Sequence, residues 1–182
     1  ICPNHLMYSF TEGRPCTRCL GGSKLNCLRH RCIHSSTVKS LLGVLEAWLY
    51  GALKTYRLVD LYICPSRFLG EKITADNPKL AEKAFTLHNF VDTPKEVEPN
   101  KNPQSYVAFV GRLSGEKGID LLARTAKLLP DVEFRVAGSG PDAELIENIP
   151  NIKPTGFLTG QELTDLVANS KLLVLPSICF ES

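Results

Sequence analysis

The sequence predicts an α/β protein built on parallel sheets, and three observations lead to this fold class. Short apolar runs alternate with amphipathic stretches of helical length over residues 106–175. The apolar runs at 106–110 and 132–137 both end in glycine-containing turns. A stretch rich in Pro, Glu, Lys and Asn separates this regular half from an earlier half with shorter elements. Alternation at this spacing is typical of β-α-β units, so we expect a doubly wound sheet.

Composition limits the class of protein further. The chain has 182 residues, of which 43% are hydrophobic and 22% charged, and its formal net charge is +2. These values are ordinary for a globular protein and exclude disorder, collagen or a coiled coil for the whole chain. The longest apolar stretch, 41–53, is interrupted by Glu46, so no membrane-spanning helix is expected. The chain starts at Ile1 and stops just after an expected strand, which favours a piece of a longer protein.

The first 35 residues form a basic, cysteine-rich segment. Residues 1–40 carry six Lys or Arg against one acid, and five of the seven cysteines lie within the first 32 residues. A C-x-x-C pair and a C-x4-C pair together make a candidate structural zinc site, formed by Cys16, Cys19, Cys27 and Cys32. Reduced thiols in a loop and disulfides are the alternatives. Aromatic residues are not interleaved with the cations as in nucleic-acid-binding modules, so no nucleic-acid partner is expected.

The next segment, residues 36–90, reads as a mixture of helices and short strands. A Ser-Ser-Thr cap predicts a helix from residue 37 to about 56, with an apolar stripe that includes Leu41, Leu45 and Trp48. We expect this stripe to face the core, although a membrane surface is the alternative. Further elements are expected as strands at 61–64 and 85–87 and helices at 67–74 and 78–84. Residues 91–105 have no periodicity and read as a linker.

From residue 106 the pattern is regular. Strands are expected at 106–110, 132–137, 151–153 and 172–175. Helices are expected at 119–129 and 142–147, and a third is expected after Thr159, which forms a capping box with Glu162. Ligands of such sheets bind beyond the carboxyl ends of the strands, so the residues that follow each strand are the candidate site.

Three loops after these strands contain residues that could bind a ligand. The first reads GRLSGEKG and places Arg112 and Lys117 five residues apart around a glycine-rich turn, which could neutralise a diphosphate or simply be solvated. The second reads GSGPDA and superficially matches the dinucleotide fingerprint, but Pro141 lacks one of the amides that would meet a pyrophosphate. The third ends in Glu181, whose carboxylate could accept hydrogen bonds from sugar hydroxyls or could be solvated.

The order of these motifs closely resembles one known family. GRLSGEKG, VAGSGP, NIKPTGFLTGQEL and LLVLPSICFES follow one another as in the carboxyl-terminal domain of family-four (group 1) glycosyltransferases. Upstream, ICPSRFLGEKI and LHNFVD are similar to the end of that family's amino-terminal domain. The resemblance covers roughly residues 36–182. It implies the GT-B architecture of two Rossmann-like domains facing across a cleft, both incomplete here: residues 36–90, a linker at 91–105, and residues 106–182, after the cysteine-rich segment 1–35.

The resemblance also implies an activity. Members transfer a hexose with retention from a UDP- or GDP-sugar to a glycan or lipid-linked acceptor, without a metal cofactor, in the cytoplasm and often at the inner face of the membrane. By this likeness Arg112 and Lys117 bind the diphosphate and Glu181 contacts the donor sugar. Gly111 would give backbone room beside the diphosphate, and Gly138 and Gly140 would shape the donor cleft. The loop of Gly156, Phe157 and Leu158 would contact the nucleobase through its backbone.

Departures from the family pattern leave alternatives open. The second Glu of the E-x7-E motif would fall beyond Ser182, and the family's acceptor-side His would precede Ile1. We therefore expect this chain by itself to be inactive. Two other functions remain as hypotheses: a non-catalytic nucleotide-sugar-binding module, and an interaction protein whose amino-terminal segment is stapled by a metal.

Overall fold

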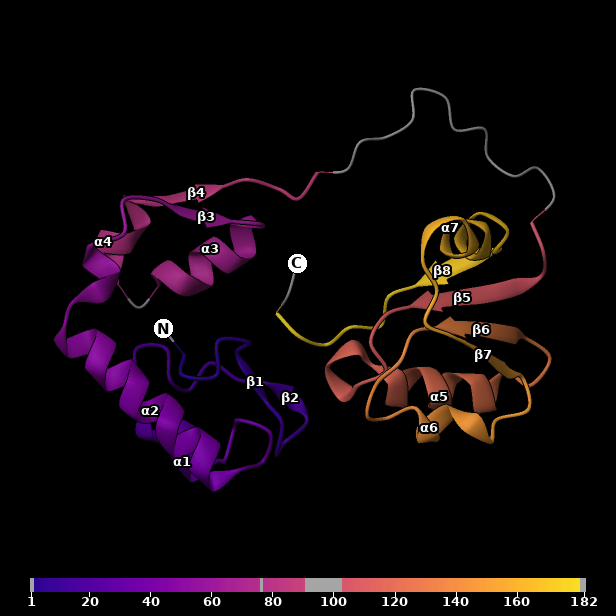
Figure 1. Cartoon of the computed structure of the whole chain (residues 1–182), viewed down its shortest axis with the longest axis horizontal. Coiled ribbons are helices and arrows are strands. Elements are labelled where there is room, and N and C mark those ends of the chain that lie inside the picture. The colour runs from indigo at the N-terminus through magenta and orange to yellow at the C-terminus, as the bar shows by residue number, and fades with distance from the viewer. Residues whose placement is uncertain (1, 76, 91–102, 181–182) are drawn as a thin grey trace. The chain divides into compact units, whose positions relative to one another are not determined.

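The computed structural model describes residues 2–75, 77–90 and 103–180, and divides into two compact units. The first unit comprises residues 1–92 with 179–182, and the second comprises residues 93–178 (Figure 1). Parallel strands occur in both units. The predicted class, an α/β protein with parallel sheets, is therefore confirmed.

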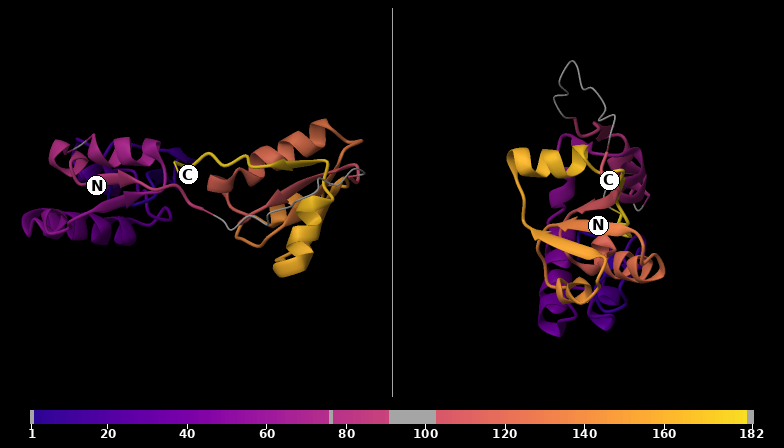
Figure 2. Two further views of the ribbon diagram at one scale, coloured as in Figure 1. Left: turned by 90° about the horizontal axis from the view of Figure 1, so that it is seen from above. Right: turned by 90° about the vertical axis from the view of Figure 1, so that its right-hand side faces the viewer.

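The second unit is a four-stranded parallel sheet with helices on both faces. The sheet order is β7-β6-β5-β8, formed by β5 (Tyr106–Val110), β6 (Glu133–Ala137), β7 (Ile152–Gly156) and β8 (Leu172–Val174). The helical elements are η2 (Gly115–Lys117), α5 (Ile119–Leu128), α6 (Glu144–Glu147) and α7 (Gly160–Ala168). Figure 1 shows α5 and α6 on one face of the sheet and α7 on the other, and the right-hand view of Figure 2 shows the same separation.

Burial on both faces explains why β5 reads as a continuous apolar run. In β5, Ala108 faces α7 and packs with Leu166, whereas Phe109 joins the larger cluster that includes Ile119 of α5 and Ile146 of α6. All five of these side chains are almost completely buried, namely Ala108, Phe109, Ile119, Ile146 and Leu166. A parallel strand enclosed in this way has no solvent face to mark with polar residues. Burial of each large apolar side chain contributes roughly 1.5–3 kcal/mol to folding.

The first unit consists of small elements around the cysteine-rich segment. Its strands are β1 (Tyr8–Ser9), β2 (Arg14–Pro15), β3 (Tyr62–Cys64) and β4 (Ala84–Thr86), with β1 antiparallel to β2 and β3 parallel to β4. Its helical elements are α1 (Leu25–Arg29), α2 (Thr37–Ala52), η1 (Thr55–Arg57), α3 (Arg67–Thr74) and α4 (Pro78–Ala81). The hydroxyls of Ser36 and Ser66 cap α2 and α3 by accepting hydrogen bonds from backbone N–H groups in the first turn.

Helix α2 packs through a face other than the predicted apolar stripe. Its buried residues are Ser40, Gly43 and Val44, whereas Leu41 and Trp48 remain 42% and 49% exposed. A Cβ on Gly43 would lie 2.7 Å from the Cδ1 atom of Ile33, so the small residue allows the helix to approach the cysteine-rich segment closely. Within the described ranges, no helix combines the length and apolar character needed to cross a membrane.

Other boundaries differ from the sequence prediction for local reasons. The helix predicted to reach residue 56 ends at Ala52, because Lys54 adopts the left-handed conformation with φ of 53° before η1 begins. The helix predicted at 78–84 ends at Ala81 because Ala84 joins β4. Strand β7 extends to Gly156 rather than ending at residue 153. Thr159 is the N-cap of α7, but its side chain makes no capping hydrogen bond, so the predicted capping box is not formed.

Candidate functional site

The carboxyl ends of three adjacent strands lie in one row. The sheet register pairs Val110 with Ala137, and Ala137 with Gly156. The loops that follow β5, β6 and β7 therefore start side by side at one edge of the sheet. This edge is where ligands bind in open parallel sheets.

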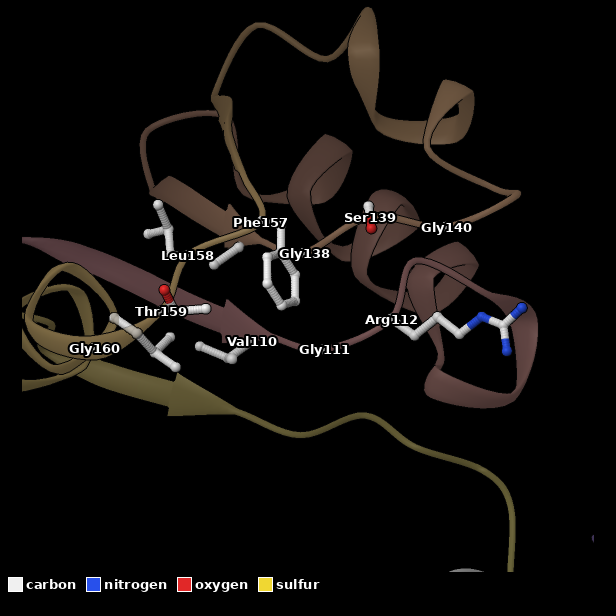
Figure 3. Close-up of a pocket in the computed structure, with 12 residues that line it drawn as sticks. Val110, Gly111, Arg112, Gly138, Ser139, Gly140, Phe157, Leu158, Thr159 and Gly160 are labelled. Carbon is white, nitrogen blue, oxygen red and sulfur yellow. The ribbon is translucent and has the colours of Figure 1, made fainter.

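A cavity of about 700 Å³ opens between these loops, entirely within the second unit (Figure 3). The residues that line it come from the ends of β5, β6 and β7 and from the start of α7. They are Val110, Gly111, Arg112, Ala137, Gly138, Ser139, Gly140, Phe157, Leu158, Thr159, Gly160 and Leu163. Its volume is in the range of sites that hold small ligands and cofactors.

Glycine makes one wall of the cavity compact. Gly138 has φ of 142°, and a Cβ there would lie 1.8 Å from the carbonyl oxygen of Gly111. A Cβ on Gly140 would lie 2.2 Å from the carbonyl oxygen of Leu113. Backbone hydrogen bonds join the same two loops, from Gly111 to Ala137 and from Leu113 to Ser139, each 3.0 Å long. Only glycine allows this approach, so the loops after β5 and β6 form one continuous backbone surface.

The two ends of the cavity differ in chemistry. Figure 3 shows the side chain of Arg112 extending away from the ring of Phe157. The apolar side chains of Val110, Phe157, Leu158 and Leu163 also line the cavity, and Figure 3 shows the first three on the side away from the Arg112 guanidinium. A guanidinium donates paired hydrogen bonds to phosphate or carboxylate. The arrangement suits a ligand with an anionic group at one end and a flat apolar group at the other.

The second predicted cation, Lys117, lies in η2 and is not among the residues that line the cavity. The turn that carries it is well fixed. The backbone N–H of Lys117 donates to the carbonyl oxygen of Ser114 at 3.0 Å, and the Ser114 hydroxyl donates to the buried carboxylate of Glu116 at 2.7 Å. Both cations thus belong to one loop whose backbone is held by internal hydrogen bonds.

The remaining predicted donor-site residues have different outcomes. Gly111, Gly138, Gly140, Phe157 and Leu158 line the cavity. Gly156 does not line it, but its carbonyl oxygen accepts a hydrogen bond from the backbone of Gly138 at 2.8 Å and so fixes the neighbouring loop. Glu181 lies outside the described residues.

Sequence reasoning missed several lining residues. Those not singled out as site residues are Val110, Ala137, Ser139, Thr159, Gly160 and Leu163. Four of them, Val110, Ala137, Ser139 and Thr159, are direct neighbours of predicted positions. Including one residue on each side of every predicted position would have found these four. Leu163 had no such signal, because its spacing in α7 also fits an ordinary core position.

The predicted zinc ligands do not come together as a set of four. Cys19, Cys27 and Cys32 are buried in one cluster with Cys2, whereas Cys16 is partly exposed and outside it. A hydrogen bond from the Cys19 thiol lowers the pKa of Cys2 to about 6, and burial raises the pKa of Cys27 to about 12. In the part of the chain that the structure describes, no three His, Cys, Asp or Glu side chains are placed to hold a metal ion. Cys2, Cys19, Cys27 and Cys32 pack in this cluster as small apolar residues.

Comparison with known sequences shows which proteins this chain resembles. Residues 104–182 match the family model described as glycosyl transferases, group 1. An uncharacterized glycosyltransferase of Methanocaldococcus jannaschii is 25% identical over 95% of this chain and 48% of its own length. The sulfoquinovosyl transferase SQD2 of Arabidopsis thaliana is 28% identical over 67% of this chain and 27% of its own length.

A third relative has a higher sequence identity over a shorter part of the chain. The GDP-mannose-dependent alpha-mannosyltransferase of Corynebacterium glutamicum is 39% identical over 38% of this chain and 17% of its own length. The chain therefore spans about half or less of the length of the curated relatives it matches.

Solved structures support the fold. The pneumococcal O-GlcNAc transferase GtfA, solved with UDP and GlcNAc, aligns with 69% of this chain and 27% of its own, with a TM-score of 0.53 and 19% identity. TarM aligns with 66% of this chain and 26% of its own, with a TM-score of 0.50 and 22% identity. At these identities the likeness concerns the fold alone.

Proposed function

We propose that this chain, whose residues 104–182 match the family model of group 1 glycosyl transferases, supplies the donor-binding part of an enzyme that transfers a sugar from a nucleoside-diphosphate sugar. The observation that carries the proposal is the cavity at the ends of β5, β6 and β7, which Arg112 lines together with several apolar side chains. A nucleoside diphosphate has the same two-part character.

The residues of the first loop would act on the leaving diphosphate. Arg112 would donate paired hydrogen bonds to phosphate oxygens, and Lys117 would add a compact positive charge. Negative charge on the diphosphate increases as the bond to the sugar breaks, so fixed cations stabilise the transition state more than the bound donor. Two protein cations can thus supply the charge neutralisation that transfer requires, and we propose a transfer that needs no metal cofactor.

The finer features of the reaction are also proposals. We infer a hexose carried on UDP or GDP, transferred with retention of configuration to a glycan or lipid-linked acceptor. Glu181 would hold hydroxyl groups of the donor sugar, and the first unit would contribute to the acceptor side. One relative is a GDP-mannose-dependent alpha-mannosyltransferase, which supports a nucleotide-sugar donor.

Nucleotide binding to this chain tests the proposal. UDP and GDP would be titrated into the chain by calorimetry in the presence of EDTA, and the titrations repeated with Arg112→Ala and Lys117→Ala. Loss of a hydrogen bond to a charged group predicts affinity lower by roughly 10- to 100-fold for each variant. Arg124→Ala is the matched control, because Arg124 is exposed on α5 and does not line the cavity. Equal affinity in all four proteins, or no binding of either nucleotide, would contradict the proposal.

A further inference from the structure

Two thiols of the first unit, those of Cys2 and Cys19, form a hydrogen-bonded pair. The Cys19 thiol donates a hydrogen bond to the sulfur of Cys2. Both side chains belong to the buried cysteine cluster, where Cys2 is 7% exposed and Cys19 is 3% exposed. The fold therefore sets two cysteines that are distant in the sequence side by side.

The hairpin of β1 and β2 explains why these two residues meet. The two strands pair in antiparallel orientation (Figure 1), and the backbone N–H of Cys16 donates to the carbonyl oxygen of Met7 at 2.7 Å. The residues after β2 thus run back beside those before β1. Cys19 is held at its carbonyl oxygen, which accepts a hydrogen bond from Nζ of Lys24 at 2.5 Å. The pairing of the two sulfurs follows from this ordered backbone.

Cys2 also lines a cavity of about 190 Å³ that belongs to the first unit. The other lining residues are mostly apolar, namely His5, Met7, Leu20, Leu69 and Ile73. The volume is below the roughly 300–1,000 Å³ of sites for drug-sized ligands, but well above the roughly 30 Å³ of one water molecule. A small reagent can therefore reach the sulfur of Cys2, although little of its surface is exposed.

The surroundings of Cys2 favour its reactive form. The hydrogen bond from Cys19 and the positive charge of Lys24 lower the pKa of Cys2. Burial instead raises the pKa of Cys27, whose side chain is fully buried. The thiolate, and not the thiol, is the nucleophile in cysteine chemistry. Cys2 is therefore suited to react as well as to pack.

We propose that Cys2 and Cys19 form a peroxide-sensitive pair, in which Cys2 is the attacking sulfur and Cys19 the resolving one. First, the Cys2 thiolate attacks the hydroxyl oxygen of a hydroperoxide. The O–O bond breaks, Cys2 becomes a sulfenic acid, and hydroxide or alkoxide leaves. Next, the sulfur of Cys19 attacks the sulfur of Cys2. The S–S bond forms, the S–O bond breaks, and the hydroxyl group leaves as water with the proton of the Cys19 thiol.

The overall step moves two electrons from the two sulfurs to the peroxide, and an external thiol reverses it by exchange. A redox-sensing cysteine typically has a lowered pKa, is accessible to the oxidant and lies next to a resolving cysteine. The pair meets the first and third conditions directly, and the cavity provides the second. This chemistry uses only residues of the first unit and does not depend on sugar transfer.

Peptide mapping of the oxidised chain tests the pairing. The reduced chain would be treated with hydrogen peroxide, blocked with N-ethylmaleimide, digested and mapped by mass spectrometry. We expect one disulfide that joins Cys2 to Cys19 and that dithiothreitol reverses. The same treatment in urea should spread the disulfides over several cysteines, because the pairing depends on the fold. A disulfide between Cys27 and Cys32 instead, or the same disulfides with and without urea, would overturn the proposal.

Single substitutions separate the two roles. Cys19→Ala removes the resolving sulfur, so dimedone should trap the sulfenic acid on Cys2. Cys2→Ala should abolish the peroxide-dependent disulfide and leave Cys19 as a free thiol. Cys16→Ala is the matched control, because Cys16 is partly exposed and lies outside the cluster, and it should leave the yield of disulfide unchanged.

Three results of these measurements would contradict the assigned roles. They are a dimedone adduct spread evenly over the thiols, oxidation of Cys19 that persists in Cys2→Ala, and zinc bound to the reduced chain that protects both thiols from peroxide. Thermal unfolding of the reduced variants shows whether each one is folded. The map of the unsubstituted chain decides the pairing even if a variant is not.

Discussion

The backbone N–H of Ile178 donates a hydrogen bond to the carbonyl oxygen of Glu116, 3.0 Å away. This bond joins the segment that follows β8 to the turn between the two cations of the first loop. The two segments also approach closely at a second point, because a Cβ on Gly118 would lie 2.2 Å from the carbonyl oxygen of Pro176. The position of the cation loop therefore depends on the chain after β8 as well as on its own hydrogen bonds.

Gly118→Ala is expected to destabilise the second unit. Gly118 has φ of 74°, and a left-handed backbone costs a residue with a side chain roughly 1–2 kcal/mol. The contact with Pro176 adds to this cost, because the segment after β8 must move. Gly160→Ala is the matched control, since Gly160 also has positive φ but a Cβ there would meet no atom within 4 Å. Thermal unfolding should show the larger loss for Gly118→Ala, and equal losses would contradict the contact.

Asn151 is expected to be a structural residue of the same unit. Its side-chain amide donates to the carbonyl oxygens of Ala126, Leu129 and Val132 at 2.9–3.0 Å, and so ties the end of α5 to the turn before β6. Asn151→Ala leaves these oxygens without that donor and should cost roughly 1–3 kcal/mol. Asn151→Asp should cost more at neutral pH, because a carboxylate would face three carbonyl oxygens. Denaturant unfolding measures both, and an Asp variant as stable as the parent would refute the assignment.

Glu12 is expected to make the stability of the first unit depend on pH. Hydrogen bonds from Arg18 and Arg14 lower the pKa of Glu12 from 4.5 to about 2. A folded-state pKa below the unfolded value means that the stabilisation is fully present above pH 4.5 and is lost as the pH falls towards 2. Melting temperatures of the parent and Glu12→Gln should therefore differ most at pH 7 and converge near pH 2. A difference that does not change with pH would argue against these ion pairs.

Two interpretations of the cysteine-rich first segment predict different effects of substituting its cysteines. Cys27 is fully buried and Cys16 is partly exposed outside the cluster, so packing predicts that Cys27→Ser destabilises the protein and Cys16→Ser does not. The zinc hypothesis drawn from the sequence predicts instead that either change releases a bound metal. Metal content by mass spectrometry, together with thermal unfolding of both variants, decides between them. Bound zinc that Cys16→Ser removes would support the hypothesis against the packing.

The sequence predicted the second unit well because its signals are local. The limits of β5 and the start of α5 match the prediction, since a buried parallel strand is a continuous apolar run and Gly118 marks the start of the helix. The cavity residues Gly111, Arg112 and Gly138 were likewise found because they follow strands directly. The exposure of Phe157 was not predictable, because an aromatic residue after a strand is more often buried.

The first unit was less predictable for a physical reason. Hydrophobic periodicity marks one apolar side of α2, yet the helix packs through Ser40, Gly43 and Val44. Close packing between elements can depend on the smallest side chains, which carry no hydrophobic signal. The buried cluster contains Cys2 rather than the predicted Cys16. Which cysteines come together depends on how the segment folds back on itself, and the spacing of cysteines in the sequence does not indicate this.

The order of strands in the second unit has a consequence for synthesis on the ribosome. β5 emerges first and pairs with β6, but its other edge pairs with β8, where Val107 meets Leu172. A nascent chain must therefore carry one unpaired edge of its central strand until the last strand leaves the exit tunnel. Such an edge can pair with another chain, and contacts distant in sequence form slowly. Until β8 is translated, the unpaired edge of β5 is therefore a place where this unit can aggregate.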